Sequence, residues 1–163
     1  AAGHFASAGG NAANHIARWD GASWQPLGSG IGGVSPATNV LSLTRAAVGV
    51  TVWASPRHGA RAFGLGDVAV DPSAAFIGRL FGVRDLALGV TARHPDPALR
   101  RAAITVGMAV DSADVVAGLL ALCKGAPKLG VLIGAGGAAT LVALGALALR
   151  ELDGAAEEAT EAA

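Results

Sequence analysis

The sequence predicts an all-α protein: an antiparallel up-down four-helix transmembrane bundle with a short N-terminal β-hairpin-like extension. Three observations lead to this fold class. The 163 residues are 52% hydrophobic and only 15% charged, whereas roughly 25% of residues are charged in a typical soluble domain. Proline follows a helix-capping residue directly before several long apolar runs. Charged residues of both signs lie inside those runs, as in helices that pack together within a membrane.

Residues 1–33 differ from the rest of the chain because they are polar and Gly-rich and hold two of the three tryptophans. Residues 15–28 read His-Ile-Ala-Arg-Trp-Asp-Gly-Ala-Ser-Trp-Gln-Pro-Leu-Gly. Asp20-Gly21 is a favoured tight-turn pair between two short strands, which predicts a hairpin. The pattern Ala-Gly-Gly…Ile-Ala-Arg-Trp-Asp-Gly…Trp…Leu-Gly resembles one blade repeat of kelch or galactose-oxidase-type β-propellers. A propeller needs about four blades or more, so we interpret this single copy as an appendage or the edge of a gene fusion. Residues 28–33 then form a flexible linker.

Four helices are predicted from the positions of proline. Ser35-Pro36, Asp71-Pro72 and Asp96-Pro97 each combine a capping residue with proline at the first helical position, where its missing N–H is tolerated. Pro127 marks a fourth start. The predicted helices cover residues 36–54, 72–93, 97–123 and 127–150, close to the length of about 20 residues that spans a bilayer. Residues 34–150 therefore form the membrane domain, and the acidic residues 151–163 form a disordered, solvated tail.

The connections between the helices predict their arrangement. The second and third connections are short, which makes neighbouring helices antiparallel. The first connection, residues 55–71, is longer and contains a basic segment with Arg57, His58 and Arg61 that suits a membrane interface. Basic residues are equally numerous on the two sides, so the positive-inside rule does not set an orientation.

The last predicted helix is the most apolar, since residues 129–149 contain no charge. Within it, Gly130, Gly134 and Ala138 repeat at four-residue spacing. Small residues at this spacing allow membrane helices to approach closely. We therefore expect this face to pack against another helix or to form a homo-oligomer.

Six charged residues inside the predicted spans are the candidate functional set: Arg45, Arg79, Arg84, Asp85, Asp111 and Asp114. Each would cost about 2.5–3.5 kcal/mol at the centre of a bilayer unless it is paired. At about 1.5 Å per residue, Arg79 and Asp111 both lie about 21 Å from the connection that they share. Asp114 shares the face of Asp111. Arg45 comes within about one turn of Asp85.

Two hypotheses follow for these charges. In the first, they form a neutralised ion-pair network that fixes helix register in a non-enzymatic structural or accessory membrane protein. In the second, they form the polar pathway of a small transporter or proton-linked carrier, which would use Arg79, Arg84, Asp111 and Asp114.

A family resemblance supports the membrane interpretation. Ala54-Ser55-Pro56…Phe63-Gly64-Leu65…Gly-Val-Arg-Asp-Leu-Ala-Leu-Gly (residues 82–89), followed by Asp-Ser-Ala-Asp (111–114), resembles small bacterial four-helix integral membrane proteins of the DoxX-like group. The resemblance covers residues 36–150. It implies a multi-pass protein of the inner membrane whose surroundings are the lipid bilayer, and it supplies no catalytic residue.

A third hypothesis is a soluble dinucleotide-binding fragment. Residues 131–139 contain Gly-x-Gly-x-x-Ala, formed by Gly134, Gly136 and Ala139, which matches the dinucleotide fingerprint. Other classes are not indicated. The formal net charge is zero, so no nucleic-acid partner is expected. The single cysteine, Cys123, excludes an internal disulfide, and the histidines lack metal-ligand spacing. No cofactor is predicted.

Overall fold

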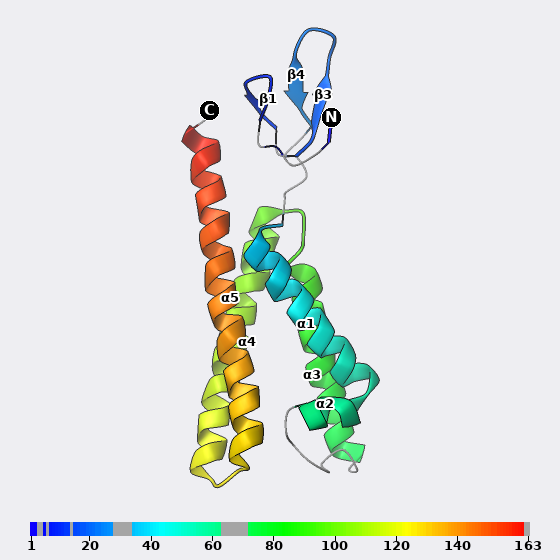
Figure 1. Cartoon of the computed structure of the whole chain (residues 1–163), viewed down its shortest axis with the longest axis vertical. Helices are drawn as coiled ribbons and strands as arrows, with labels where there is room; N and C mark the ends of the chain where they lie inside the picture. Colours follow the sequence, from blue (N-terminus) through cyan, green and yellow to red (C-terminus); the bar gives the residue numbers. More distant parts are fainter. Residues whose placement is uncertain (3–4, 6, 14, 28–33, 63–71, 162–163) are drawn as a thin grey trace.

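The computed structural model describes residues 1–2, 5, 7–13, 15–27, 34–62 and 72–161. Over these residues the chain is mostly helical, with two small β-hairpins at its N-terminal end (Figure 1). The order is β1 (Ser7–Ala8), β2 (Asn11–Ala12), β3 (Ala17–Trp19), β4 (Trp24–Pro26), α1 (Pro36–Ala54), α2 (Pro56–Ala62), α3 (Pro72–Thr91), α4 (Pro97–Cys123) and α5 (Lys128–Glu161). The prediction of a largely helical chain is confirmed.

The predicted hairpin is present as β3 and β4, which pair Trp19 opposite Trp24. The two indole rings contact edge to face with centroids 5.6 Å apart. The turn is held by Asp20, whose carboxylate accepts from the backbone N–H groups of Ala22 and Ser23 and from the Gln25 amide. These donors, the Ala22 N–H first, lower the pKa of Asp20 to about 2.

A second hairpin, β1–β2, was not expected from the sequence. It turns through Gly9 and Gly10, which both have positive φ, +59° and +85°. Two consecutive positive φ angles are what a tight hairpin turn requires, and glycine adopts them without strain. The resemblance to a propeller blade stays a prediction, because a pair of short hairpins is common to many β folds.

The long helices begin where the sequence predicts. Ser35 accepts a bond from the Thr38 N–H through its hydroxyl, and Asp96 accepts one from the Ala98 N–H at 2.8 Å. The predicted cap Asp71 lies outside the described residues. Two differences appear elsewhere. The basic segment after Ala54 forms the short helix α2 rather than a loop. The tail predicted to be disordered instead continues α5 to Glu161, because Ala and Glu are strong helix formers.

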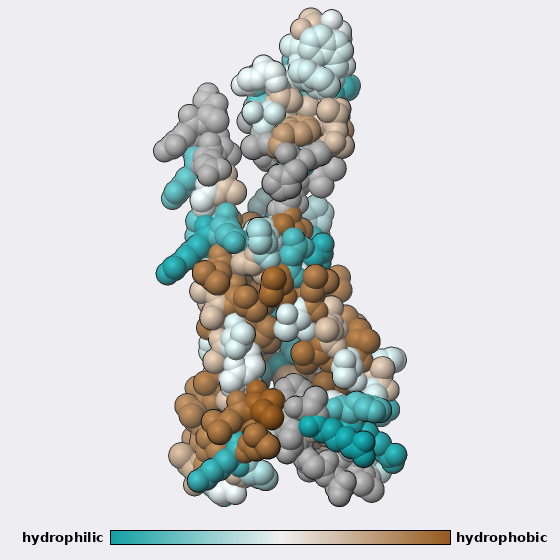
Figure 2. Space-filling model, viewed as in Figure 1, coloured by the Kyte–Doolittle hydropathy of each residue, from teal (hydrophilic) through white to brown (hydrophobic). Residues whose placement is uncertain are grey.

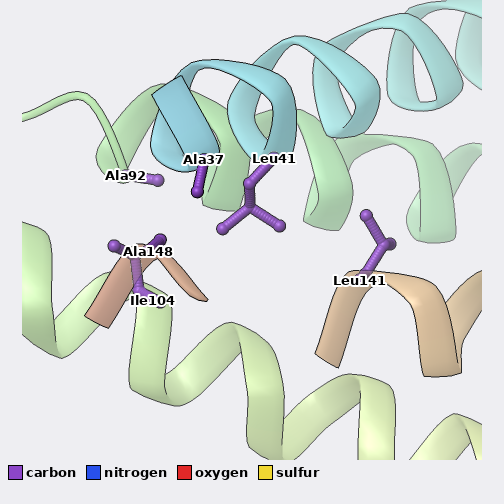
Figure 3. Close-up of a cluster of buried hydrophobic side chains, with 6 residues drawn as sticks. All are labelled: Ala37, Leu41, Ala92, Ile104, Leu141 and Ala148. Carbon is purple, nitrogen blue, oxygen red and sulfur yellow. The ribbon is translucent and has the colours of Figure 1, made fainter. Parts of the chain in front are cut away.

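The four long helices alternate in direction and form two antiparallel pairs, α1 with α3 and α4 with α5. Figure 1 shows the pairs meeting below the β-hairpins, near the middle of the view, and diverging toward the end that carries α2. A small apolar cluster joins them there: Ala37, Leu41, Ala92, Ile104, Leu141 and Ala148 (Figure 3). α1, α4, α5 and the residue after α3 all contribute to this cluster.

Two helices, α4 and α5, are long and apolar enough to cross a membrane. In the most apolar stretch of each helix, only 11% of α4 and 22% of α5 is buried inside the protein. The core helix of a soluble protein is mostly buried. α1 and α3 do not meet the same criteria of length and composition, so two of the four predicted spans are supported in this way. Figure 2 shows a broad apolar band over the long helices with hydrophilic groups above and below it.

Candidate functional site

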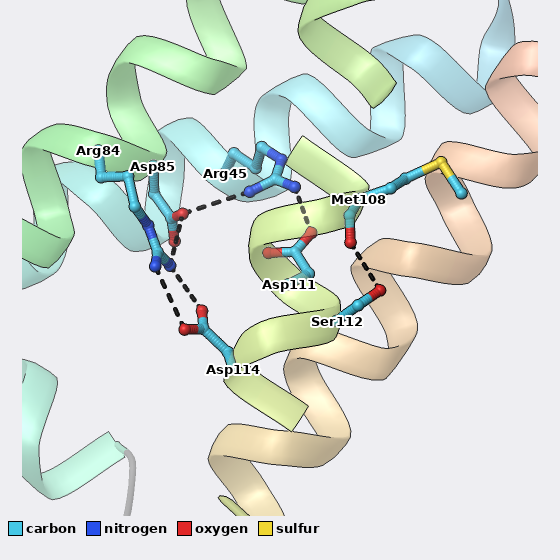
Figure 4. A network of polar contacts seen from close by, with 7 residues as sticks. All are labelled: Arg45, Arg84, Asp85, Met108, Asp111, Ser112 and Asp114. Carbon is cyan, nitrogen blue, oxygen red and sulfur yellow. Dashed lines mark hydrogen bonds and ion pairs between the residues drawn. The ribbon is translucent and has the colours of Figure 1, made fainter. Parts of the chain in front are cut away.

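Arg45 is the centre of a buried cluster of charges where α1, α3 and α4 face one another (Figure 4). Its side chain is 2% exposed. One terminal nitrogen donates to Oδ1 of Asp85 on α3 at 3.3 Å, and the other donates to the carboxylate of Asp111 on α4. Both carboxylates are as deeply buried as the guanidinium. One arginine therefore links three helices through ion pairs that water does not screen.

Arg84 extends the cluster toward the surface. Its guanidinium donates to both carboxylate oxygens of Asp114, at 2.8 and 3.3 Å, and to Oδ1 of Asp85 at 3.4 Å. The guanidinium also lies 4.2 Å from the centre of the Phe81 ring, a cation–π contact. The side chains of Arg84 and Asp114 are 30% and 33% exposed, so this outer pair reaches the surface.

The five charges do not balance. Two arginines face three aspartates, so the formal charge of the cluster is +2 − 3 = −1. Asp85 accepts from both arginines through the same oxygen, Oδ1. The cluster therefore contains one carboxylate more than it has guanidinium groups.

Glycines on the helices make the close approach of these charges possible. Gly49, four residues after Arg45, and Gly82, three residues before Asp85, face each other so closely that a Cβ on either would lie 2.7 Å from the carbonyl oxygen of the other. A Cβ at Gly89 would lie 2.9 Å from the Ser42 carbonyl oxygen and 3.1 Å from Cβ of Arg45. On α4, a Cβ at Gly107 would lie 2.9 Å from a terminal nitrogen of Arg45. The glycines on α1 and α3 let these two helices approach closely, and Gly107 leaves room for the guanidinium beside α4.

The structure brings together five of the six charges predicted to form the network. Arg79 is the exception, because its side chain is exposed and forms no ion pair with any residue in the described ranges. The equal depth of Arg79 and Asp111 along their helices does not bring the two side chains together, and Arg45 pairs with Asp111 instead. Arg79 lies six residues before Asp85, which at 100° per residue turns it away from the face that Asp85 occupies.

The predicted packing motif of α5 is present only in part. Gly130 and Ala138 are buried, but a Cβ added at Gly134 would meet nothing within 4 Å, so Gly134 is not a point of close approach. The tight contacts between α4 and α5 occur elsewhere, at Gly118 against Ala135 and at Gly145 against Met108. The dinucleotide interpretation also fails, because Gly134, Gly136 and Ala139 all lie inside the continuous helix α5. A phosphate-binding glycine loop must instead precede a helix.

A second polar layer, not predicted from the sequence, lies near the start of α1. Glu151 on α5 accepts a hydrogen bond from the Ala37 N–H in the first turn of α1, at 3.1 Å. Arg100 is buried and donates to the His94 carbonyl at 3.0 Å, and Arg101 pairs with Asp153 on α5. Counting residues from the α4–α5 connection gives Arg101 and Asp153 similar depths. The depth counting used for the central charges would therefore have found this pair.

Comparison with known proteins matches the chain to no protein family, no curated protein and no solved structure.

Proposed function

We propose that the chain is a non-enzymatic, multi-pass protein of the inner membrane, in which all four long helices span the bilayer and the Arg45-centred network holds them in register. Its role is structural or accessory. The observation that carries this proposal is the combination of buried charges at the centre with apolar side chains at the surface. Arg45, Asp85 and Asp111 are almost completely buried.

Large apolar side chains, by contrast, are exposed on every long helix, including Leu43 on α1, Ile77 on α3, Leu120 on α4 and Leu132 on α5. A soluble monomer rarely exposes apolar surface of this extent, whereas lipid-facing helices do so by necessity. In a bilayer the three central charges would each be costly alone. Pairing within the bundle offsets that cost and makes one arrangement of α1, α3 and α4 strongly preferred.

Membrane partitioning tests this proposal. We expect the full chain to remain in the pellet after alkaline carbonate extraction, to be released only by detergent, and to follow inner-membrane markers on a density gradient. The reason is that carbonate strips proteins held by charge but not helices buried in hydrocarbon. A peripheral membrane protein from the same cells is the control. Release of the chain by carbonate, or recovery in the soluble fraction, would contradict the proposal.

A proton-linked carrier is the second candidate, favoured by the extra carboxylate of the cluster and by the partial exposure of Arg84 and Asp114. In this role the outer pair would pass a proton between the surface and the buried carboxylates. With the protein reconstituted in vesicles containing a pH-sensitive dye, Asp114→Asn should slow proton entry after a pH step at least tenfold. Asp153→Asn, which removes the acidic partner of an exposed ion pair outside the cluster, is the matched control. If proton entry is equally fast with either variant and in protein-free vesicles, the carrier role is contradicted and only the structural role remains.

A further inference from the structure

The end of the molecule that carries α2 presents basic side chains that have no acidic partner among the described residues. We refer to α2, the last turn of α1 and the α4–α5 connection as the α2 end. Its exposed cations are Arg57, Arg61, Lys124 and Lys128, and none of them forms an ion pair within the part of the chain that the structure describes. The sequence also places Asp67 and Asp71 in the connection after α2, outside the described residues.

The opposite end is different in charge and in pairing. Arg101 is paired there with Asp153, Arg100 is buried against a carbonyl, and Arg93 donates to the side chains of Asn39 and Ser42. α5 adds the acidic residues Glu151 and Glu157 at this end. The basic groups at this end are mostly engaged within the protein, whereas those of the α2 end are available to another molecule.

α2 is oriented so that its two arginines point away from the protein. Gly59 is buried against Val52 of α1, where an added Cβ would lie 2.9 Å from a Val52 methyl group. Arg57 and Arg61 are each two residues from Gly59, so both project from the opposite face of the helix, one turn apart. Figure 1 shows α2 beside the lower end of α1 and α3, and Figure 2 shows hydrophilic groups bordering the apolar band there.

We infer that the exposed face of α2 binds the headgroups of anionic phospholipids, with Arg57 and Arg61 as the groups that contact phosphate. Trp53 lies one turn before α2 and is 52% exposed. It marks the boundary between hydrocarbon and headgroups at this end, because tryptophan is enriched at that boundary. Two neighbouring arginines at the headgroup level face a surface of opposite charge. The arginine side chain can also form two hydrogen bonds with one phosphate group. The inference rests on the membrane embedding proposed above.

Native mass spectrometry of the purified full chain tests the inference. The chain is held in neutral detergent with equimolar phosphatidylcholine and phosphatidylglycerol of the same acyl chains. We expect wild-type protein to retain phosphatidylglycerol preferentially. Each basic residue near an anionic surface contributes about fivefold in affinity, so Arg57→Gln with Arg61→Gln should weaken retention about twenty-five-fold. Arg57→Lys with Arg61→Lys should keep the preference, since the charge remains.

The matched control is Arg18→Gln with Arg150→Gln, which removes two exposed arginines that lie away from the α2 end and form no ion pair in the described ranges. It should retain phosphatidylglycerol as the wild type does. Equal retention of the two lipids by wild-type protein, or full preference in the Arg57→Gln, Arg61→Gln variant, would overturn the inference. Carbonate extraction of each variant separates this failure from failure of the membrane proposal, because a chain that stays embedded but shows no lipid preference refutes only the headgroup site.

Discussion

Replacing Arg45 by methionine is expected to destabilise the folded chain by about 3–5 kcal/mol. The substitution leaves Asp85 without its buried partner and Asp111 without any partner in the described structure, and both carboxylates remain inside the bundle. Removing one member of a buried ion pair is far more harmful than never having the pair, because the remaining charge is neither solvated nor neutralised. Thermal unfolding of the detergent-purified protein, followed by circular dichroism, measures the loss.

Arg79→Met is the control for that variant. It makes the same chemical change on a neighbouring helix, but its side chain is exposed and unpaired in the described structure. We expect no loss of stability, because an unpaired charge on a spanning helix is itself costly. A second comparison removes the whole triad by combining Arg45→Met with Asp85→Leu and Asp111→Leu. Replacing all members of a buried ionic group by apolar residues is often neutral, so most of the stability should return. Equal stability of the Arg45→Met and Arg79→Met proteins would contradict the network's structural role.

How far the sequence predicts this fold depends on whether a signal is local. The starts of α1 and α4 could be predicted because Ser35 and Asp96 cap a helix through atoms only two or three residues away. The short helix α2 was missed because seven residues with a central glycine carry little helical preference of their own. α2 is held by packing of Gly59 on Val52, a contact that composition does not reveal.

For the charged cluster, the sequence predicts how deep each charge lies along its helix but not the direction in which its side chain points. Counting residues from a connection gives the level of each charge along its helix, which predicts Asp111 at the depth of Arg79 and Asp114 on the same face as Asp111. The count does not say which way a side chain faces across helices. It puts Arg79 at the depth of Asp111, whereas Arg45 is the residue that pairs with Asp111. The direction of Arg45 is set by Gly89 on α3 and Gly107 on α4, which leave room for its side chain on two helices. Neither glycine stands out in a sequence with 24 of them.

Gly82→Ala is expected to have the second largest effect, because the backbones of α1 and α3 touch at this residue. The added Cβ would lie 2.7 Å from the Gly49 carbonyl oxygen and 2.9 Å from the Trp53 backbone nitrogen. Backbone atoms cannot turn aside as a flexible side chain can, so the helices must separate. Overpacking of this kind costs about 1–3 kcal/mol, measured as a lower midpoint of thermal unfolding in detergent. Separation would also lengthen the contact between Arg45 and Asp85, since Asp85 lies three residues after Gly82.

Gly134→Ala provides the opposite expectation within the same protein. A Cβ at Gly134 meets nothing within 4 Å, and alanine favours a helix over glycine by about 0.8–1.0 kcal/mol, so this variant should be at least as stable as the wild type. Gly49→Ala should resemble Gly82→Ala, because each glycine faces the other's carbonyl oxygen. The double variant should lose less than the two single losses combined, since helices already forced apart accommodate the second methyl group. Unchanged stability of Gly82→Ala together with a loss in Gly134→Ala would mean that the tight helix contact lies on α5, as the small-residue spacing predicts, and not between α1 and α3.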